Sequence, residues 1–471
     1  MENYCPKCGS RITFNEKNNK YTCSNCGHSF YEKEVYINRK KVNEGYYNKK
    51  TPLEPNKSYV GLIFAVLGIS IALFCVLTTI TRYTFYKDFK VKMTGETVSI
   101  TELKNKTKEK LVIPSSVVKI GYNAMEDSMA RSITIEYGLR TIEDYAFKNC
   151  KNLVDITIPR SVKYIGQNSF FGNDRLKDVY YDGTIEDWCN IYFYAPREHK
   201  GCAKYDIADN FGDASPMDPA SNFYILDKNG NVEHNNKKYS LLTELTIPKS
   251  VYTLGDHQFS GFDCITQVTI PENVSIIKNS TFYGCTNLKK VNIEGKLTHI
   301  PINTFRNCTS LEEVVLSDSI TYMDRCAFYD CSSLVKLNFD HIIAIYNKAF
   351  HNAGFKSLEF SDKEMHIDSR AFEECKKLVS LHIGYGVKDI SYYAFSNCSN
   401  LYHVSIPTTI ENIEEMAFYN CGLLTQIEYR GTIDYFRYYV HLKQDWNKNT
   451  LINNIKCSDG DYSVTLNNVT N

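Results

Sequence analysis

Four cysteines near the amino terminus are the residues best suited to chemistry. Cys5 and Cys8 form one C-x2-C pair, and Cys23 and Cys26 form a second pair after 14 intervening residues. A glycine follows each pair and lets the backbone turn so that both sulfurs face one ion. Four thiolates in closed tetrahedral geometry select zinc and leave no open position for catalysis. The spacing therefore predicts one structural Zn²⁺ as the cofactor.

The segment around these cysteines, residues 1–30, is too short to bury a hydrophobic core. Metal binding must therefore supply its folding free energy. The segment resembles the short zinc ribbons found at the amino termini of bacterial membrane proteins. Zinc thiolates persist where thiols stay reduced, which favours a cytosolic location for this end of the chain.

A membrane span is predicted at residues 59–80, where 22 consecutive residues carry no charge. A helix of that length crosses a hydrocarbon core about 30 Å thick. The stretch neither starts near residue 1 nor ends in the cleavage site of a signal peptide. Residues 1–58 hold 11 Lys and Arg against 6 Asp and Glu. The positive-inside rule thus favours a cytosolic amino terminus, with the rest of the chain outside.

The span also carries small residues four apart on one helical face. Such a pattern lets two helices approach closely in lipid, so a weak homodimer through this helix stays open. Ordinary small residues of a membrane helix are the favoured interpretation. The pattern occurs at Gly61, Ala65, Gly68 and Ala72.

Beyond the span, the sequence repeats itself every 22 or 23 residues. Each repeat follows A-F-x-x-C-x-x-L-x-x-[IVL]-x-[IL]-P-x-x-[VI]-x-x-I, as in Ala146–Ile165 and Ala394–Ile413. This spacing is typical of a leucine-rich solenoid, in which each coil has a short strand, a turn, a second extended piece and a tight turn at Ala-Phe. The predicted fold is a β-rich leucine-rich-repeat solenoid of about eleven coils, plus a small zinc ribbon and one transmembrane helix.

The repeat resembles the BspA-like bacterial leucine-rich-repeat family over roughly residues 95–471. One gap of 89 residues interrupts the spacing, between Phe170 and Phe259. G-T-x-x-x-W insertions similar to Gly183–Trp188 occur in that family, and Gly431–Phe436 is a looser copy in which phenylalanine replaces tryptophan. The resemblance implies a surface protein for binding or adhesion.

These features give the predicted domain organisation along the chain. The domains are a zinc ribbon at 1–30, a polar basic tether at 31–58, the transmembrane helix at 59–80, a stalk and N-terminal cap at 81–110, repeats at 111–182, an insertion at 183–240, repeats at 241–428 and a C-terminal cap at 429–471.

Seven cysteines recur three residues after the repeat phenylalanine. A ligand role would not tolerate Asn173 and Ala353, which replace the cysteine in two coils. We therefore interpret the position as structural filling of the turn. Outside this series, Cys189 and Cys202 are open to pairing in an oxidising compartment. The seven residues are Cys150, Cys285, Cys308, Cys331, Cys375, Cys398 and Cys421.

Within the insertion, Asp227–Asn231 has the alternating oxygen side chains of a calcium loop. Val232 and Lys238 occupy the positions where such a loop needs Gly and Glu. Asn229-Gly230 instead predicts a hairpin turn.

No catalytic constellation emerges, so the chain is not expected to be an enzyme. The predicted functional surface is a ladder of one exposed side chain per coil on the strand face, which is polar and nearly neutral. Such surfaces bind proteins or glycans through many weak contacts, and a merely solvated face is the alternative. The ladder comprises Thr157, Thr246, Thr269, Asn292, Asn338, Glu359, His382, Ser405 and Glu428, with Val315 as its one apolar member.

The sequence thus predicts a membrane-anchored bacterial surface protein that binds protein or glycan. One alternative is a transmembrane sensor whose ribbon docks a cytosolic partner when the solenoid is occupied. Another is a membrane-tethered ribbon that binds nucleic acid. The net charge of zero disfavours nucleic acid as a partner, because phosphate contacts need a surplus of Lys and Arg.

Overall fold

The computed structural model describes residues 12–15, 20–23, 29–31, 86–193 and 215–464 of the 471-residue chain. It divides into two compact units, residues 1–79 and 80–471. Among the described residues, no helix is long and apolar enough to cross a membrane. The predicted span at residues 59–80 lies outside them.

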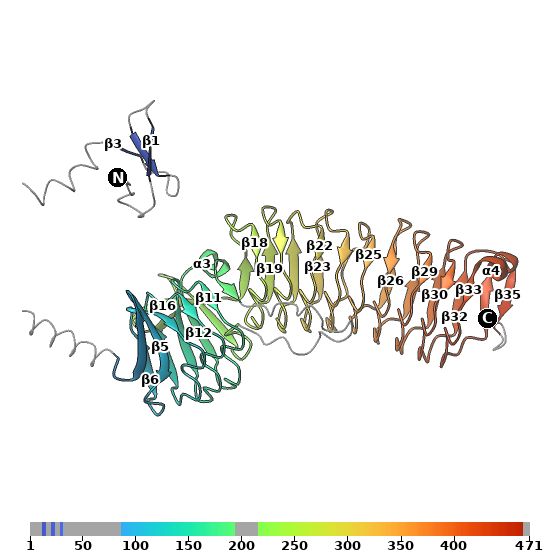
Figure 1. Ribbon diagram of the computed structural model, residues 1–471. Coiled ribbons are helices and arrows are strands. Elements are labelled where there is room, and N and C mark those ends of the chain that lie inside the picture. Colours follow the sequence, from blue (N-terminus) through green and yellow to red (C-terminus); the bar gives the residue numbers. More distant parts are fainter. Residues whose placement is uncertain (1–11, 16–19, 24–28, 32–85, 194–214, 465–471) are drawn as a thin grey trace, which may run out of the picture. The chain divides into compact units, whose positions relative to one another are not determined.

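The smaller unit contains three short strands in one antiparallel sheet, in the order β1-β2-β3 (Figure 1). Three of the four predicted zinc ligands, Cys5, Cys8 and Cys26, lie outside the described residues, so the zinc site stays a prediction. The strands are β1 (Ile12–Asn15), β2 (Lys20–Cys23) and β3 (Ser29–Tyr31).

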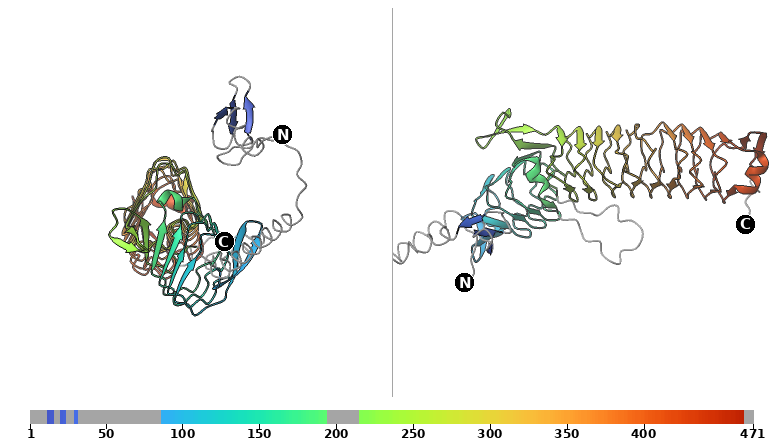
Figure 2. Two further views of the ribbon diagram at one scale, coloured as in Figure 1. Left: turned by 90° about the vertical axis from the view of Figure 1, so that its left-hand side faces the viewer. Right: turned by 90° about the horizontal axis from the view of Figure 1, so that it is seen from above.

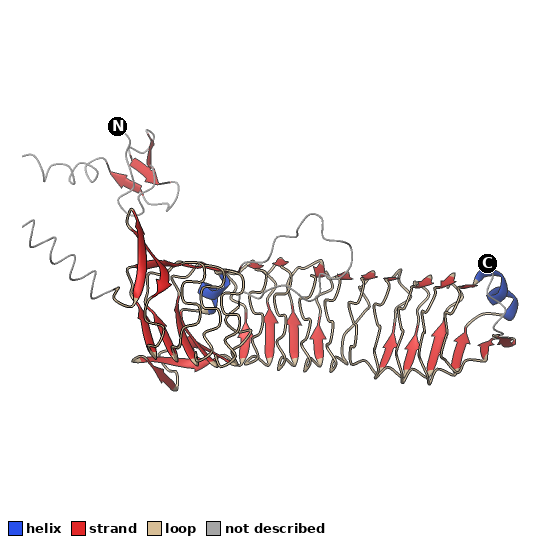
Figure 3. Cartoon of the chain, turned by 60° about the horizontal axis from the view of Figure 1, so that its bottom comes forward, coloured by secondary structure: helices blue, strands red, loops and turns tan. Residues whose placement is uncertain are grey.

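The larger unit is a solenoid in which most coils contribute one strand to each of two sets of parallel sheets. Figure 3 shows the longer strands, here called first strands, lying side by side along the solenoid. They are β6 (Lys110–Ile113), β8 (Ser132–Ile135), β10 (Asp155–Pro159), β12 (Asp178–Asp182), β14 (Asn222–Leu226), β17 (Glu244–Thr246), β19 (Gln267–Ile270), β21 (Lys290–Ile293), β23 (Glu313–Val315), β26 (Ser357–Glu359), β28 (Ser380–His382), β30 (His403–Ile406), β32 (Gln426–Tyr429) and β34 (Asn454–Cys457).

The shorter strands, here called second strands, follow the first strand of each coil after a turn. Most are two residues long, and they pair in parallel with the second strands of the neighbouring coils. They are β5 (Thr97–Leu103), β7 (Val117–Ile120), β9 (Thr141–Ile142), β11 (Tyr164–Ile165), β13 (Tyr192–Phe193), β18 (Thr253–Leu254), β20 (Ile276–Ile277), β22 (His299–Ile300), β24 (Tyr322–Met323), β25 (Ala344–Ile345), β27 (His366–Ile367), β29 (Asp389–Ile390), β31 (Asn412–Ile413) and β33 (His441–Leu442).

The described part of the chain therefore has about fourteen coils rather than the predicted eleven. The extra coils escape the sequence pattern because they lack the Ala-Phe turn. One contains the short helix α3 (Ile185–Cys189), another begins at β14, and the last contains α4 (Ile433–Tyr439). In these coils other residues provide the buried side chains, among them Trp188, Phe223 and Phe436.

A column of stacked phenylalanine rings runs through the turns. From Phe259 to Phe418 every neighbouring pair of rings is stacked, with centroids 5.2–5.8 Å apart and planes within 14° of parallel. Each ring covers part of the next, and nearly all of these side chains are fully buried. Stacking of this kind gives a coil a hydrophobic contact that it cannot form within itself.

The turn that carries each phenylalanine uses two left-handed backbone positions four residues apart. In one coil these are Tyr145 (φ 58°) and Asn149 (φ 57°). The second position is often Asn or Gly, which tolerate this conformation best. Between them, the Phe147 N–H donates to the Ser169 carbonyl of the next coil at 2.8 Å. Neighbouring turns are therefore held together by backbone hydrogen bonds as well as by ring stacking.

The repeated cysteine has a structural role in this turn. Its thiol donates to the carbonyl of the residue at the phenylalanine position one coil earlier. Examples are Cys308 to Phe282 at 3.2 Å and Cys331 to Phe305 at 3.1 Å. Burial raises the pKa of Cys150 to about 12, which keeps that thiol protonated. A protonated, hydrogen-bonded thiol is a poor nucleophile and a poor metal ligand.

An antiparallel hairpin interrupts the parallel first strands between β14 and β17, and we divide the larger unit there into an N-terminal segment (residues 86–242) and a C-terminal segment (243–464). The hairpin of β15 (Val232–His234) and β16 (Lys237–Leu241) ends the first-strand sheet after β14 (Figure 2). The second-strand sheet stops at β13 and resumes at β18.

The hairpin turn predicted at Asn229-Gly230 is wrong in position. The strand β14 pairs with β16 and not with β15, so residues 227–230 form only a connecting turn. The tight turn is at Asn235 (φ 49°) and Asn236 (φ 60°), which are the two positive angles that a two-residue hairpin requires.

Both ends of the solenoid are closed by antiparallel pairs. At the amino end, β4 (Phe89–Thr94) pairs with β5, and at the carboxyl end β34 pairs with β35 (Gly460–Ser463). An antiparallel return occupies the sheet edge on which a further coil would otherwise stack.

The two G-T motifs form equivalent helical coils. Thr184 caps α3, and Thr432 caps α4 through a hydrogen bond from the Tyr435 N–H. The aromatic residue four positions after each threonine packs edge-on against a tyrosine, with Trp188 on Tyr181 and Phe436 on Tyr429, both at 5.0 Å.

The glycine of each motif is needed for close approach to that tyrosine. A Cβ at Gly183 would lie 2.7 Å from a ring carbon of Tyr181, and one at Gly431 would lie 2.6 Å from a ring carbon of Tyr429. The motif is therefore explained by packing.

We expect Phe328→Ala to lower the free energy of unfolding by about 3–5 kcal/mol, because it leaves a cavity between two stacked rings. Urea unfolding followed by circular dichroism measures this change. As a control, Val335→Ala alters an exposed side chain next to the bridge residue Lys336 and should change stability by about 0.5 kcal/mol or less. Equal losses in both variants would contradict the stacking account.

Candidate functional site

Most of the predicted ladder residues share one row across the first strands, whereas Asn338 lies two residues after the isolated bridge at Lys336 and belongs to no strand. In the C-terminal segment, Thr246 lies opposite Thr269, and the row continues through Asn292 to Val315. Farther along, His382 lies opposite both Glu359 and Ser405, and Ser405 lies opposite Glu428. Most members are exposed or half-exposed, as a contact surface requires.

The expected exposure is wrong at Thr157 and Ser405, which are 2% and 7% exposed. Arg430 crosses the coil of Ser405 and reaches the side chain of His382 at 3.2 Å and the carbonyl of Ile383. Thr157 is covered by the β15–β16 hairpin. In both places a residue distant in sequence covers a position that faces outward in its own coil.

The hairpin lies on the first-strand face of the N-terminal segment through polar contacts. Thr157 Oγ1 lies 3.1 Å from His234 Nε2, and Asn235 Nδ2 donates to Thr134 Oγ1 at 3.0 Å. Tyr239 donates its hydroxyl to Asp182 at 2.5 Å, and Lys237 forms an ion pair with the same carboxylate. The β15–β16 hairpin therefore covers part of the predicted binding face.

Two tyrosines that sequence reasoning missed belong to this row. Tyr180 lies opposite Thr157, and Tyr224 lies opposite Tyr180. Their rings stack at 4.9 Å, and His234 stacks on Tyr180 at 3.8 Å. The signal was present in the sequence, since extending the repeat register into Asp178–Asp182 puts Tyr180 at the ladder position.

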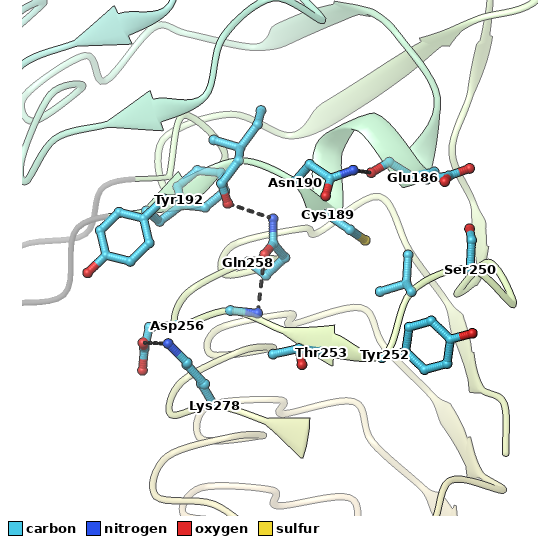
Figure 4. Close-up of a pocket in the computed structure, with 14 residues that line it drawn as sticks. Glu186, Cys189, Asn190, Tyr192, Ser250, Tyr252, Thr253, Asp256, Gln258 and Lys278 are labelled. Atoms are coloured by element: carbon cyan, nitrogen blue, oxygen red, sulfur yellow. Dashed lines mark hydrogen bonds and ion pairs between the residues drawn. The ribbon is translucent and has the colours of Figure 1, made fainter. Parts of the chain in front are cut away.

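A cleft of about 490 Å³ lies at the junction of the two segments, where the second-strand sheet is interrupted. Figure 4 shows it between the α3 coil and the first coil of the C-terminal segment. We call it the junction cleft. It is lined by Glu186, Cys189, Asn190, Ile191, Tyr192, Phe193, Ser250, Val251, Tyr252, Thr253, Gly255, Asp256, Gln258 and Lys278.

A reciprocal pair of hydrogen bonds holds Gln258, one of the lining residues, to the buried Trp188. The indole N–H of Trp188 donates to the Gln258 carbonyl at 2.8 Å, and the Gln258 side chain donates back to the Trp188 carbonyl at 2.7 Å. Trp188 and Gln258 are both buried. Because each residue belongs to a different segment, these bonds hold the two walls of the cleft together.

The exposed groups of the cleft are suited to binding rather than to reaction. Tyr192 and Tyr252 are 54% and 63% exposed. The Asp256 carboxylate oxygen Oδ2 lies 3.7 Å from Nζ of Lys278. Burial raises the pKa of Cys189 to about 12, so the one thiol in the cleft is not an activated nucleophile. Its suggested partner, Cys202, lies outside the described residues.

Within the part of the chain that the structure describes, no three His, Cys, Asp or Glu side chains are grouped as metal ligands. That part includes Asp227, whose carboxylate accepts hydrogen bonds from the Asn229 N–H and the Ser240 hydroxyl. These two bonds lower the pKa of Asp227. They also show that its carboxylate stabilises the turn before the hairpin.

Comparison with protein families gives one match that covers most of the chain. The family described as "BspA type Leucine rich repeat region" matches residues 78–198, 232–353 and 343–457 in six copies. None of the curated proteins compared with the sequence matches it.

Several solved structures are similar to parts of the chain. A leucine-rich repeat protein from Bacteroides ovatus is 19% identical, with a TM-score of 0.47 over 78% of this chain and 89% of its own. A leucine rich cell surface protein from Faecalibacterium prausnitzii is 19% identical, with a TM-score of 0.40 over 75% and 96%. The pneumococcal vaccine antigen PcpA is 14% identical, with a TM-score of 0.40 over 77% and 96%.

We expect the β15–β16 hairpin to loosen from the first-strand face as the pH falls from 7.5 to 5.5. Burial lowers the pKa of His234 below its ordinary value of about 6.5, although Asp155, Asp182 and Asp178 oppose this shift. The undocked hairpin therefore takes up a proton more readily, so acid favours undocking. Hydrogen exchange of residues 237–241, corrected for the intrinsic effect of pH, measures docking.

His234→Phe keeps a flat ring for stacking on Tyr180 and removes the titration. In this variant the protection of residues 237–241 should not depend on pH. The control His341→Phe alters a half-exposed histidine outside the hairpin and should leave the wild-type pH dependence intact. Protection that is the same at both pH values in the wild-type chain would contradict the prediction.

Proposed function

The chain belongs to the BspA-type leucine-rich-repeat family, and from that premise we propose that it is a bacterial surface protein whose solenoid binds a protein or glycan ligand. The observation that carries the proposal is the junction cleft. It is a concave site of about 490 Å³, within the size range of small-ligand pockets, and it lies where the second strands stop at β13 and resume at β18.

The chemistry of the cleft is that of a recognition site. Tyr192 and Tyr252 offer exposed aromatic surface, on which apolar side chains or sugar rings can pack; one face of the Tyr192 ring stacks on Tyr164 at 5.8 Å. Asn190, Asp256 and Lys278 add polar groups around these rings. Gln258 is held in place by its two hydrogen bonds to Trp188, and a lining group that is fixed in advance lowers the entropic cost of binding.

The polar row of the C-terminal segment extends the same surface chemistry along the solenoid. A ligand longer than the cleft can add weak contacts to successive side chains such as Thr246, Thr269 and Asn292, which lie at strand spacing. Binding is then distributed, with the cleft as its strongest point.

We further propose that residues 59–80 anchor the chain in the membrane, with the amino terminus in the cytosol and the solenoid outside. The uncharged stretch of 22 residues and the basic surplus before it support this topology. In the same proposal Cys5, Cys8, Cys23 and Cys26 hold one structural Zn²⁺. The antiparallel pair β1–β2 is consistent with this, because it follows the first cysteine pair in the sequence and ends at Cys23 of the second.

A sensor is the second candidate function. The proposed topology puts the ribbon and the ligand surface on opposite sides of a membrane, so ligand binding outside can report to a cytosolic partner of the ribbon. Ligand-dependent proximity of two ribbons in cells would favour the sensor. Undiminished ligand binding and unchanged cell behaviour after deletion of residues 1–30 would leave adhesion as the function.

We expect Tyr192→Ala and Tyr252→Ala each to weaken ligand binding by about tenfold, as loss of a central aromatic contact does. The full chain is screened on a glycan array and on immobilised extracellular-matrix proteins, and the affinity of each positive ligand is then compared across variants. Tyr438→Ala, which removes a 74% exposed tyrosine of α4, should not change the affinity. Equal binding by all variants would place the ligand elsewhere.

The proposed topology predicts that protease added to intact cells removes a carboxyl-terminal tag and spares an amino-terminal tag. Survival of both tags, even after the outer envelope is permeabilised, would contradict an external solenoid.

In the purified chain, metal analysis should find one zinc, which the double substitution Cys5→Ser with Cys8→Ser removes. Cys457→Ser, which alters a buried cysteine of the solenoid, should retain it.

A further inference from the structure

A second cleft, of about 460 Å³, lies on the N-terminal segment and differs from the junction cleft in charge. It is formed by the turns that join first and second strands in two neighbouring coils, together with the start of α3. We call it the basic cleft. Its lining residues are Tyr137, Arg140, Arg160, Ser161, Lys163 and Asp187.

Two of the three cations occupy equivalent positions in adjacent coils. Arg140 directly precedes β9, Lys163 directly precedes β11, and these strands pair in register. The backbone N–H of Lys163 donates to the Arg140 carbonyl at 2.9 Å, which confirms the alignment. Like charges directly opposite one another on neighbouring strands destabilise a sheet. Folding alone therefore gives no reason for this pair.

Two other cations of the same segment are paired with carboxylates. Lys119 is paired with Glu143, and Lys148 lies 2.8 Å from Glu126. In contrast, no described carboxylate lies within ion-pair distance of Arg140, Arg160 or Lys163. The three exposed cations of the basic cleft are thus left to an external anion.

The single acidic residue of the cleft is already engaged. Asp187 accepts hydrogen bonds from the backbone N–H and the hydroxyl of Thr184, both at 3.0 Å. These bonds belong to the capping box of α3. The carboxylate reduces the local charge, but three cations against one anion still leave the cleft positive.

Two neutral groups suit the cleft to a sugar that carries the anion. Tyr137 is 65% exposed, with the Arg160 guanidinium 5.8 Å from its ring centre, so it offers an aromatic face beside a cation. The Ser161 hydroxyl oxygen accepts a hydrogen bond from the Gly138 N–H at 3.0 Å. The hydrogen of that hydroxyl therefore points away from Gly138.

We propose that the basic cleft binds the carboxylate or sulfate group of an acidic saccharide. The guanidinium groups of Arg140 and Arg160 hold the oxyanion, because planar donor pairs match carboxylate and sulfate oxygens. Lys163 adds charge, and Tyr137 packs against the sugar ring. The cations are confined to two coils, which does not give the extended track that a nucleic-acid backbone needs. This site is separate from the junction cleft and does not depend on the function proposed for it.

Titration of the full chain with defined oligosaccharides tests the proposal. The probes are a sulfated tetrasaccharide derived from heparin, a tetragalacturonate and a neutral tetrasaccharide. We expect the acidic probes to bind and the neutral one not to. Arg140→Gln and Arg160→Gln should each weaken binding about tenfold or more, since a hydrogen bond to a charged group contributes about 1.5–3 kcal/mol.

Arg175→Gln is the matched control, because it removes the same charge from an exposed arginine of the same segment that does not line the cleft. It should not change the affinity. Thermal unfolding separates binding from folding: Arg140→Gln relieves the repulsion with Lys163, so its midpoint in the absence of ligand should stay equal or rise. Lys163→Gln relieves the same repulsion and provides a second variant, with the same expected loss of binding.

Three results would overturn the proposal. Equal weakening by Arg175→Gln would show a general charge effect. Binding of inorganic sulfate as tight as that of the saccharides would show a free-anion site. Binding of a short DNA duplex as tight as that of the saccharides, lost in the same variants, would show a phosphate-backbone site instead.

Discussion

Contact between neighbouring coils is the interaction on which the larger unit depends. A single coil of 22 or 23 residues has two short strands and one turn, and most of its hydrogen-bonding groups point to the coils beside it. The rings of the phenylalanine column add the apolar part of this contact at 5.2–5.8 Å. Because stability accrues per interface, any feature that alters stacking has structural consequences beyond its own coil.

The two clefts that we propose as ligand sites lie near the place where the hairpin alters stacking. The β15–β16 hairpin replaces the next parallel strand after β14, and the second-strand sheet breaks between β13 and β18. The junction cleft lies in that break. The basic cleft lies beside the coil that contains α3, which comes just before the break in the sequence. Helix α3 lines both clefts, since Glu186 belongs to one and Asp187 to the other. The interruption thus brings two chemically distinct clefts close together in the sequence.

The same interruption shows how a residue's surroundings are decided at a distance. Thr157 faces outward in its own coil, yet it is covered by a hairpin whose residues follow it by almost 80 positions. Ser405 is covered in a similar way by Arg430, which bonds to a coil two repeats earlier. The contacts at Thr157 are polar and include a histidine, so the covered face is held by interactions that respond to pH more readily than the phenylalanine column does.

The amino-acid pattern by itself determined the solenoid, its repeat length, the row of ladder residues and the structural place of the cysteines. These follow from local rules, because the same spacing puts the same side chain inward in every coil. It did not determine the number of coils, since Trp188, Phe223 and Phe436 fill the core without the repeat signature. Only the tertiary structure decided which outward positions stay exposed, how the hairpin pairs, and that Arg140, Arg160 and Lys163 share one cleft. The physical reason is that these outcomes arise from contacts between coils and from chain segments that fold back over them, and no local pattern of residues encodes such contacts.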